Sequence, residues 1–196
     1  MENYFRAVTL GAFTWKNQER IALLFAYIQK TGSIWLAAHF LLLTLCLNFP
    51  VTFHIARLTP HALYSRLYGE NFSALLSESD PALMTDNEAV DAFNVSMLEN
   101  GYGRNVLMPL LGIAFVLTLI IQIVFYLCTV FFMGLSRMNM SPLSFRDRMG
   151  LALYSSTLPV LAATLFGLYL PTVHIIIYYF IIIFLVFQRS KLCPDG

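Results

Sequence analysis

Charged residues are scarce in this chain, at 12% of 196 residues, where a soluble domain carries roughly 25%. The stretch 149–188, forty residues long, contains no Asp, Glu, Lys or Arg at all. About 20 apolar residues suffice to cross a hydrocarbon core roughly 30 Å thick, so this stretch is long enough for two crossings. The shortage of charge excludes an ordinary soluble domain and predicts a polytopic membrane protein.

Cysteine is also rare, and its placement gives no support to disulfides or metal binding. The three cysteines are Cys46, Cys128 and Cys193, and no C-x-x-C spacing occurs. The chain likewise lacks G-x-x-x-x-G-K-[ST], H-E-x-x-H and G-x-S-x-G motifs. We therefore expect no metal, no cofactor and no enzymatic activity, because a membrane-embedded enzyme would lack any catalytic constellation here.

The charge-free stretch 149–188 predicts a transmembrane helical hairpin. Gly167 and Pro171 bracket its tip, since proline removes a backbone donor and clashes with the preceding turn. The arms then run over 150–168 and 172–188. Small residues that allow close helix approach are concentrated in the first arm, which predicts that it is the inner helix and the second arm the peripheral one.

Two further uncharged runs, 31–56 and 105–136, predict the first and second transmembrane helices. Residues 1–30 instead mix charges with an apolar stripe at helical spacing. That lead-in is expected either to lie along the membrane interface or to pack against the ends of the spans. The stripe consists of Ile21, Leu24, Phe25 and Ile28.

The hydrophilic segment 57–104 is acidic and carries helix-start signals. Thr59 followed by Pro60 is typical of a helix N-terminus, and Thr85 with Glu88 forms a capping box. This segment is too small for a robust core of its own. It predicts a small helical cap on the ends of the spans.

The distribution of basic residues predicts the orientation. Nine of the twelve Lys and Arg lie in the lead-in 1–30, the loop 137–148 and the tail 189–196, and three lie in 57–104. By the positive-inside rule, the first three segments are cytoplasmic and the acidic loop is outside. The fold class is thus an all-α polytopic bundle with four transmembrane helices, an interfacial N-terminal helix and a small helical external loop.

Polar residues within the predicted spans are the candidates for function. His39 is either a mechanistic group or a neutral, hydrogen-bonded packing residue. Gln122 is a donor and acceptor for interhelical hydrogen bonding, with substrate contact as the alternative. Neither residue has an acidic neighbour within its own span, so the pattern gives no support to a proton-coupled pump.

A second group of candidates surrounds Pro159. A proline at this position frees the carbonyl of Ser155, and neighbouring hydroxyls can satisfy that carbonyl. The alternatives are a stable packed kink and a hinge or polar lining for a path between spans. The residues concerned are Ser155, Ser156, Thr157 and Pro159.

The sequence also carries a family-like order of features: an aromatic lead-in, a first span ending in Phe49 and Pro50, a long external loop, and the stretch 145–159. In that stretch a basic loop enters a helix containing tyrosine, small residues and then Leu-Pro. This order resembles a family of bacterial membrane proteins labelled maltodextrose-utilisation proteins, similar to Yip-type membrane proteins. The family name implies a role beside sugar uptake, but no recognisable sugar site accompanies it, so that role is not carried over.

Two functions from different classes follow from these features. The first is an integral accessory or scaffold protein of the cytoplasmic inner membrane, non-enzymatic and multi-pass, with both termini cytoplasmic. The alternative is a small oligomeric transporter or channel subunit, because a single chain offers little polar lining. The expected partners are the lipid bilayer and either a membrane protein or further copies of this chain, with no nucleic acid.

Overall fold

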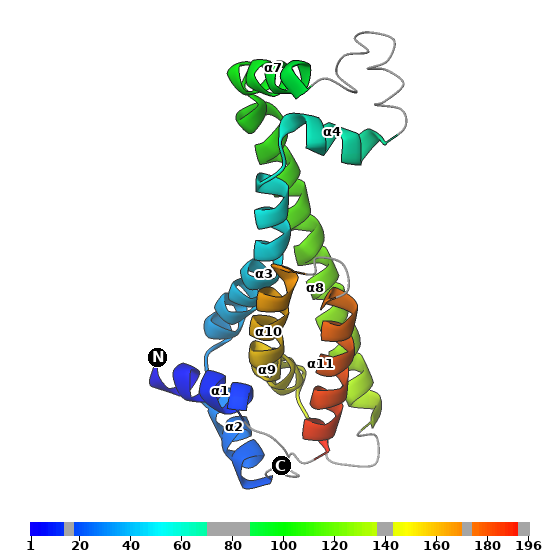
Figure 1. Cartoon of the computed structure of the whole chain (residues 1–196). Coiled ribbons are helices and arrows are strands. Elements are labelled where there is room, and N and C mark those ends of the chain that lie inside the picture. The colour runs from blue at the N-terminus through cyan, green and yellow to red at the C-terminus, as the bar shows by residue number, and fades with distance from the viewer. Residues whose placement is uncertain (14–17, 70–86, 137–142, 170–173, 192–196) are drawn as a thin grey trace. The chain divides into compact units, whose positions relative to one another are not determined.

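The protein is seen in a computed structural model that describes residues 1–13, 18–69, 87–136, 143–169 and 174–191 (Figure 1). Helices account for nearly all of these residues, and no strand occurs among them. The all-α prediction is confirmed for this part of the chain. The predicted hairpin tip lies partly outside it, as does most of the loop 137–148.

The chain divides into two compact units. The larger consists of Met1–Pro50 and Val116–Gly196, and the smaller is Val51–Phe115. Helices α3 (Ser33–Ala56) and α8 (Met108–Ser136) each contribute to both units.

The lead-in forms two helices in the larger unit, α1 (Glu2–Phe13) and α2 (Gln18–Lys30). They pack against each other and against α9 (Phe145–Ser155). All four residues of the predicted apolar stripe are buried on α2, so the helical spacing is confirmed. These contacts support the alternative in which the lead-in packs against the spans.

Two helical stretches are long and apolar enough to cross a bilayer, namely α3 and Gly103–Leu135. A third candidate is the pair formed by α9 and α10 (Thr157–Gly167), which is bent by 40° at its break. Helix α11 (His174–Ser190) is only 17 residues long, and its described apolar part is shorter still. Length and composition therefore establish two or three candidate spans, which agrees with membrane association.

Helix α9 lies in the interior of the larger unit. Every residue from position 150 to 157 is buried, and α1, α2, α10 and α11 all contact this helix. On α11, Ile182 and Val186 are buried whereas Phe184 is exposed, so the described part of this helix turns only one side inward. The inner position predicted for the third span is confirmed for α9, while α10 is less enclosed because it exposes residues such as Phe166.

Two glycines allow the helices around α9 to approach closely. A Cβ atom on Gly11 of α1 would lie 2.4 Å from the carbonyl oxygen of Tyr154, and one on Gly150 of α9 would lie 2.5 Å from Cγ2 of Ile28. Real Cβ atoms essentially never approach so closely. The absent side chains are therefore what lets α1 and α2 rest directly on α9.

The smaller unit contains α4 (Pro60–Tyr68) and α7 (Asn87–Glu99), which pack together, followed by the π-helix η1 (Gly103–Leu107). Thr59 accepts a hydrogen bond from the backbone N–H of Ala62 at the start of α4, which confirms the cap predicted there. Thr85, the first half of the predicted capping box, lies outside the described residues. No residue of α7 is buried, in keeping with a segment that has little core.

Candidate functional site

Three consecutive buried polar residues, Ser155, Ser156 and Thr157, lie at the break between α9 and α10. Helix α9 ends at Ser155, α10 begins at Thr157, and Ser156 joins them with backbone angles that remain helical. Pro159 follows in the first turn of α10 and has no N–H to donate to the preceding turn. The kink predicted from Pro159 is therefore present, with a bend of 40°.

Two hydroxyls at the break bond to backbone carbonyls. Ser156 Oγ donates to the carbonyl of Ala152 over 2.6 Å, and Thr157 Oγ1 donates to the carbonyl of Tyr154 over 2.9 Å. These acceptors differ from the predicted one, the carbonyl of Ser155. The hydroxyl of Ser155 is itself buried and has no hydrogen-bond partner among the described residues.

His39 of α3 connects this break to the N-terminal helix. Its Nε2 lies 3.1 Å from Thr157 Oγ1, and its Nδ1 lies 3.1 Å from the Tyr4 hydroxyl. The Thr157 hydroxyl has one hydrogen, which it donates to Tyr154, so the Nε2–H of His39 must donate to Thr157. Nδ1 then accepts from Tyr4, and a directional chain runs from Tyr4 through His39 to Thr157.

Aromatic rings surround this chain and shield it. Tyr4 stacks on Trp35 with ring centroids 5.0 Å apart, and the ring of Tyr154 lies 4.9 Å from that of His39. Burial raises the pKa of the Tyr4 hydroxyl, which keeps it protonated and able to donate. His39 itself is only 1% exposed.

The direction of the hydrogen bonds limits the chemistry of this site. The chain ends on the backbone carbonyl of Tyr154, which accepts a hydrogen bond but is not a site for onward proton transfer. Its members are satisfied by one another and share no contact with a described carboxylate. The arrangement is suited to fixing three helices, α1, α3 and α10, relative to one another.

Gln122 does not join this cluster. Its side chain is fully buried on α8, and neither amide atom has a hydrogen-bond partner among the described residues. A buried amide without partners is costly, so this residue differs from the satisfied His39. Its predicted interhelical hydrogen bond is not present within the described part of the chain.

Two cavities are lined by described residues of the larger unit. One, of about 440 Å³, lies between α8 and α9, and the other, of about 230 Å³, lies among α3, α8 and α9. Neither is lined by His39, Gln122 or Ser155. The candidate polar residues are thus separate from both cavities.

Sequence reasoning selected His39 and Thr157 but missed Tyr4 and Trp35. Tyr4 belongs to the lead-in, whose composition indicates only an interfacial or packing role, whereas Trp35 lies near the start of α3. The hydrogen bond between Tyr4 and His39 joins positions 35 residues apart, and no local periodicity encodes such a pair. The aromatic composition of the lead-in was the only available signal for Tyr4.

The chain matches no protein-family model, no curated protein and no solved structure. The resemblance to the maltodextrose-utilisation and Yip-type membrane proteins therefore stays a prediction.

Proposed function

We propose that this protein is a non-enzymatic accessory or scaffold protein of the cytoplasmic membrane, crossing it four times with both termini in the cytoplasm. In this arrangement α3, α8, the bent pair α9–α10 and the shorter α11 are the four spans. A helix of 17 residues extends about 26 Å at 1.5 Å per residue, close to the hydrocarbon thickness.

Contacts between segments distant in the sequence support this topology. Arg189 Nη1, near the end of α11, donates to the carbonyl of Gly11 over 2.7 Å. Arg146, at the start of α9, donates to the carbonyl of Thr31. Arg189 thus links the tail to the lead-in, and Arg146 links the loop 137–148 to Thr31, the residue directly after the lead-in. Both contacts are expected if the three segments lie on one side.

The observation that carries the scaffold proposal is the closed polar chain from Tyr4 through His39 to Thr157. In a transport path, polar side chains face water or solute, whereas here each one binds another across helices. The same unit exposes apolar side chains along α8, which give lipid or a partner protein a large surface. A fixed core and an apolar exterior suit a protein that acts by helix packing.

Affinity purification from native membranes, with cross-linking before solubilisation, tests this proposal. A scaffold should retain the same membrane-protein partner in stoichiometric amount after stringent washing. An unrelated four-helix membrane protein expressed at the same level is the control. Proteins that purify with both chains are non-specific and are excluded as partners. Recovery of the chain alone would contradict the proposal.

The topology has a separate test. Single cysteines within 57–104 should react with a membrane-impermeant maleimide in intact cells, whereas cysteines within 137–148 should react only after permeabilisation. The experiment requires a background in which the three native cysteines are replaced by serine. The opposite labelling pattern would overturn the orientation.

The alternative, an oligomeric transporter or channel subunit, is favoured by Gln122. Its fully buried amide has no described partner, as expected of a group that binds an enclosed water or solute. Solute flux into proteoliposomes that falls on Gln122→Leu, but not on the control Gln29→Leu at an exposed position, would favour this function.

A further inference from the structure

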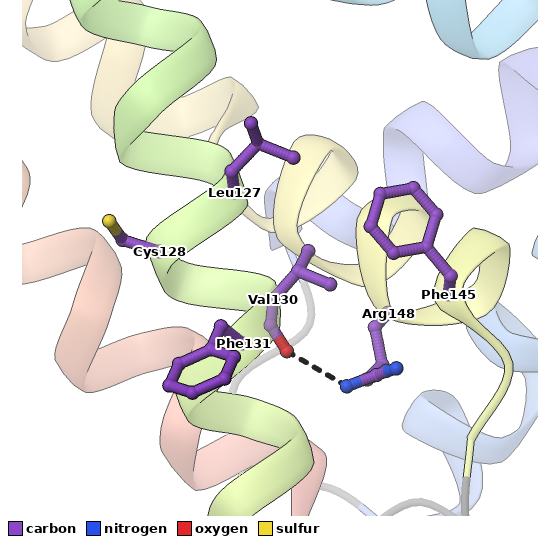
Figure 2. A pocket seen from close by; sticks show the side chains of 6 residues that line it. All are labelled: Leu127, Cys128, Val130, Phe131, Phe145 and Arg148. Carbon is purple, nitrogen blue, oxygen red and sulfur yellow. Dashed lines mark hydrogen bonds between the residues drawn. The ribbon is translucent and has the colours of Figure 1, made fainter.

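The larger of the two cavities is a groove with apolar walls and one cationic group (Figure 2). Helix α8 supplies one wall and the first turn of α9 supplies Phe145 and Arg148, which project toward α8. The side chains of Phe131 and Phe145 are more than half exposed, so the groove is accessible from outside the described protein. The residues from α8 are Leu127, Cys128, Val130 and Phe131.

The guanidinium of Arg148 is held in place at this groove. Its Nη1 donates to the carbonyl of Val130 over 3.1 Å, while Nε is buried without a partner among the described residues. The one described ion pair joins Arg6 and Glu2, so no described carboxylate neutralises Arg148. The neighbouring Asp147 is bonded to Ser144 instead.

A glycine on α8 makes room for this guanidinium. A Cβ atom on Gly134 would lie 2.2 Å from Arg148 Nη1, far closer than such contacts allow. The atom in the way is the end of a flexible side chain, so adding a methyl group would move the guanidinium at little cost to the backbone. The position of Arg148 therefore depends on the absence of a side chain at Gly134.

We propose that this groove binds one anionic phospholipid, with its phosphate at Arg148 and an acyl chain along the apolar wall of α8. A guanidinium without a carboxylate partner complements a phosphate, with which it forms strong, directional hydrogen bonds. Basic pockets at the cytoplasmic ends of helices suit anionic head groups. The lipid site rests on the proposed membrane topology, but it does not depend on whether the protein is a scaffold or a transporter.

Native mass spectrometry of the delipidated full-length protein in detergent tests this site. The protein is titrated with phosphatidylglycerol, with phosphatidylcholine of identical acyl chains, and with inorganic phosphate. We expect one phosphatidylglycerol to bind at least tenfold more tightly than phosphatidylcholine, and Arg148→Gln to abolish that preference. The control Arg20→Gln removes an exposed cation elsewhere and should leave the preference for phosphatidylglycerol unchanged.

A pair of glycine variants tests the same site without removing a charge from the protein. Gly134→Ala retains every cation but displaces the guanidinium, so it should reduce the preference for phosphatidylglycerol several-fold. Gly112→Ala on the same helix has no atom within 4 Å of its new methyl group and should bind lipid as the unaltered protein does. Thermal unfolding in detergent verifies that each variant is folded, and Gly134→Ala provides the test if Arg148→Gln does not fold.

Three outcomes would overturn the lipid site. Equal binding of the two lipids would mean that the groove holds acyl chains without recognising charge. Arg148-dependent binding of inorganic phosphate, without a preference between lipids, would mean that the cation serves a soluble anion. An unchanged lipid preference in both Arg148→Gln and Gly134→Ala would mean that the anionic lipid binds elsewhere.

Discussion

Helices α8 and α9 both belong to strongly apolar candidate spans, yet they have opposite surroundings. From position 150 to its end at Ser155, every residue of α9 is buried. In contrast, α8 exposes large apolar side chains along most of its length. Hydropathy alone would have ranked α8 above α9 as the core helix, because α9 contains Arg146, Asp147 and Arg148 whereas α8 contains no charged residue.

The difference lies in the size and polarity of the side chains. The buried stretch 150–157, which covers the end of α9 and the break after it, reads Gly-Leu-Ala-Leu-Tyr-Ser-Ser-Thr. It has small residues at which other helices approach and hydroxyls that bond within the bundle. The sequence of α8 is dominated by Ile, Leu, Val and Phe. In lipid no hydrophobic force favours burying such residues, so small side chains decide which helix is central.

The largest effect is expected from filling the contact at Gly150. In Gly150→Leu, a side chain must occupy space where even a Cβ atom lies 2.5 Å from Ile28, so α2 must leave α9. We expect a loss of about 3 kcal/mol in the free energy of unfolding, as for a severe overpacking change. The measurement is unfolding of the purified protein in detergent micelles.

Gly112→Leu is the matched control on α8, where nothing lies within 4 Å of the added atom. Its effect should be within about 0.5 kcal/mol of zero. Equal losses in the two variants would mean that α8 is as closely packed as α9, and the comparison would fail.

A smaller effect is expected from shortening leucines on the two helices. Leu153 of α9 is 2% exposed and Leu117 of α8 is 54% exposed. Leu153→Ala leaves a cavity among packed helices and should cost about 2 kcal/mol. In Leu117→Ala, lipid or detergent fills the space left by the side chain, so the temperature of unfolding should hardly change. A larger destabilisation from Leu117→Ala than from Leu153→Ala would contradict the inner position of α9.

The sequence was informative wherever a local pattern decides the structure. The spacing of Ile21, Leu24, Phe25 and Ile28 depends on one helix alone, and their common burial was predicted correctly. The same holds for the Thr59 cap and for the bend one turn before Pro159, because each follows from backbone chemistry within one turn. The all-helical, membrane-compatible fold class also follows from the low content of charged residues and from the length of the uncharged runs.

Local patterns of this kind could not predict the contacts between segments that are distant in the sequence. Gly11, Tyr154 and Arg189 meet in the structure, but the bond from Arg189 to Gly11 spans 178 residues. Tyr4 becomes the partner of His39 only once α1 has packed against the bundle. The four-span count also stays a prediction, since a 17-residue helix and a bent pair do not fix the number of crossings by length alone.

A moderate effect is expected at the hydrogen-bonded break beside α9. Thr157→Val keeps the shape of the side chain but removes the acceptor for His39 Nε2 and the donor to Tyr154. Leaving a buried imidazole N–H unsatisfied should cost about 1 kcal/mol in the free energy of unfolding. Thr9→Val is the control, because its exposed hydroxyl bonds only within its own helix; an equal loss there would contradict a special role for Thr157.

The smallest effect is expected on the exposed side of α8, and it separates two explanations for that exposure. Ile120 and Ile121 are about half exposed, at 50% and 52%. If lipid covers them, the double change Ile120→Leu and Ile121→Leu should alter unfolding by less than about 0.5 kcal/mol, because lipid tails adapt to either shape. If a partner protein covers them, the purified chain should again be unaffected, but the yield of that partner in cross-linking from native membranes should fall. The same double variant, measured in detergent and in native membranes, thus reveals whether α8 is peripheral because it faces lipid or because it belongs to an interface between proteins.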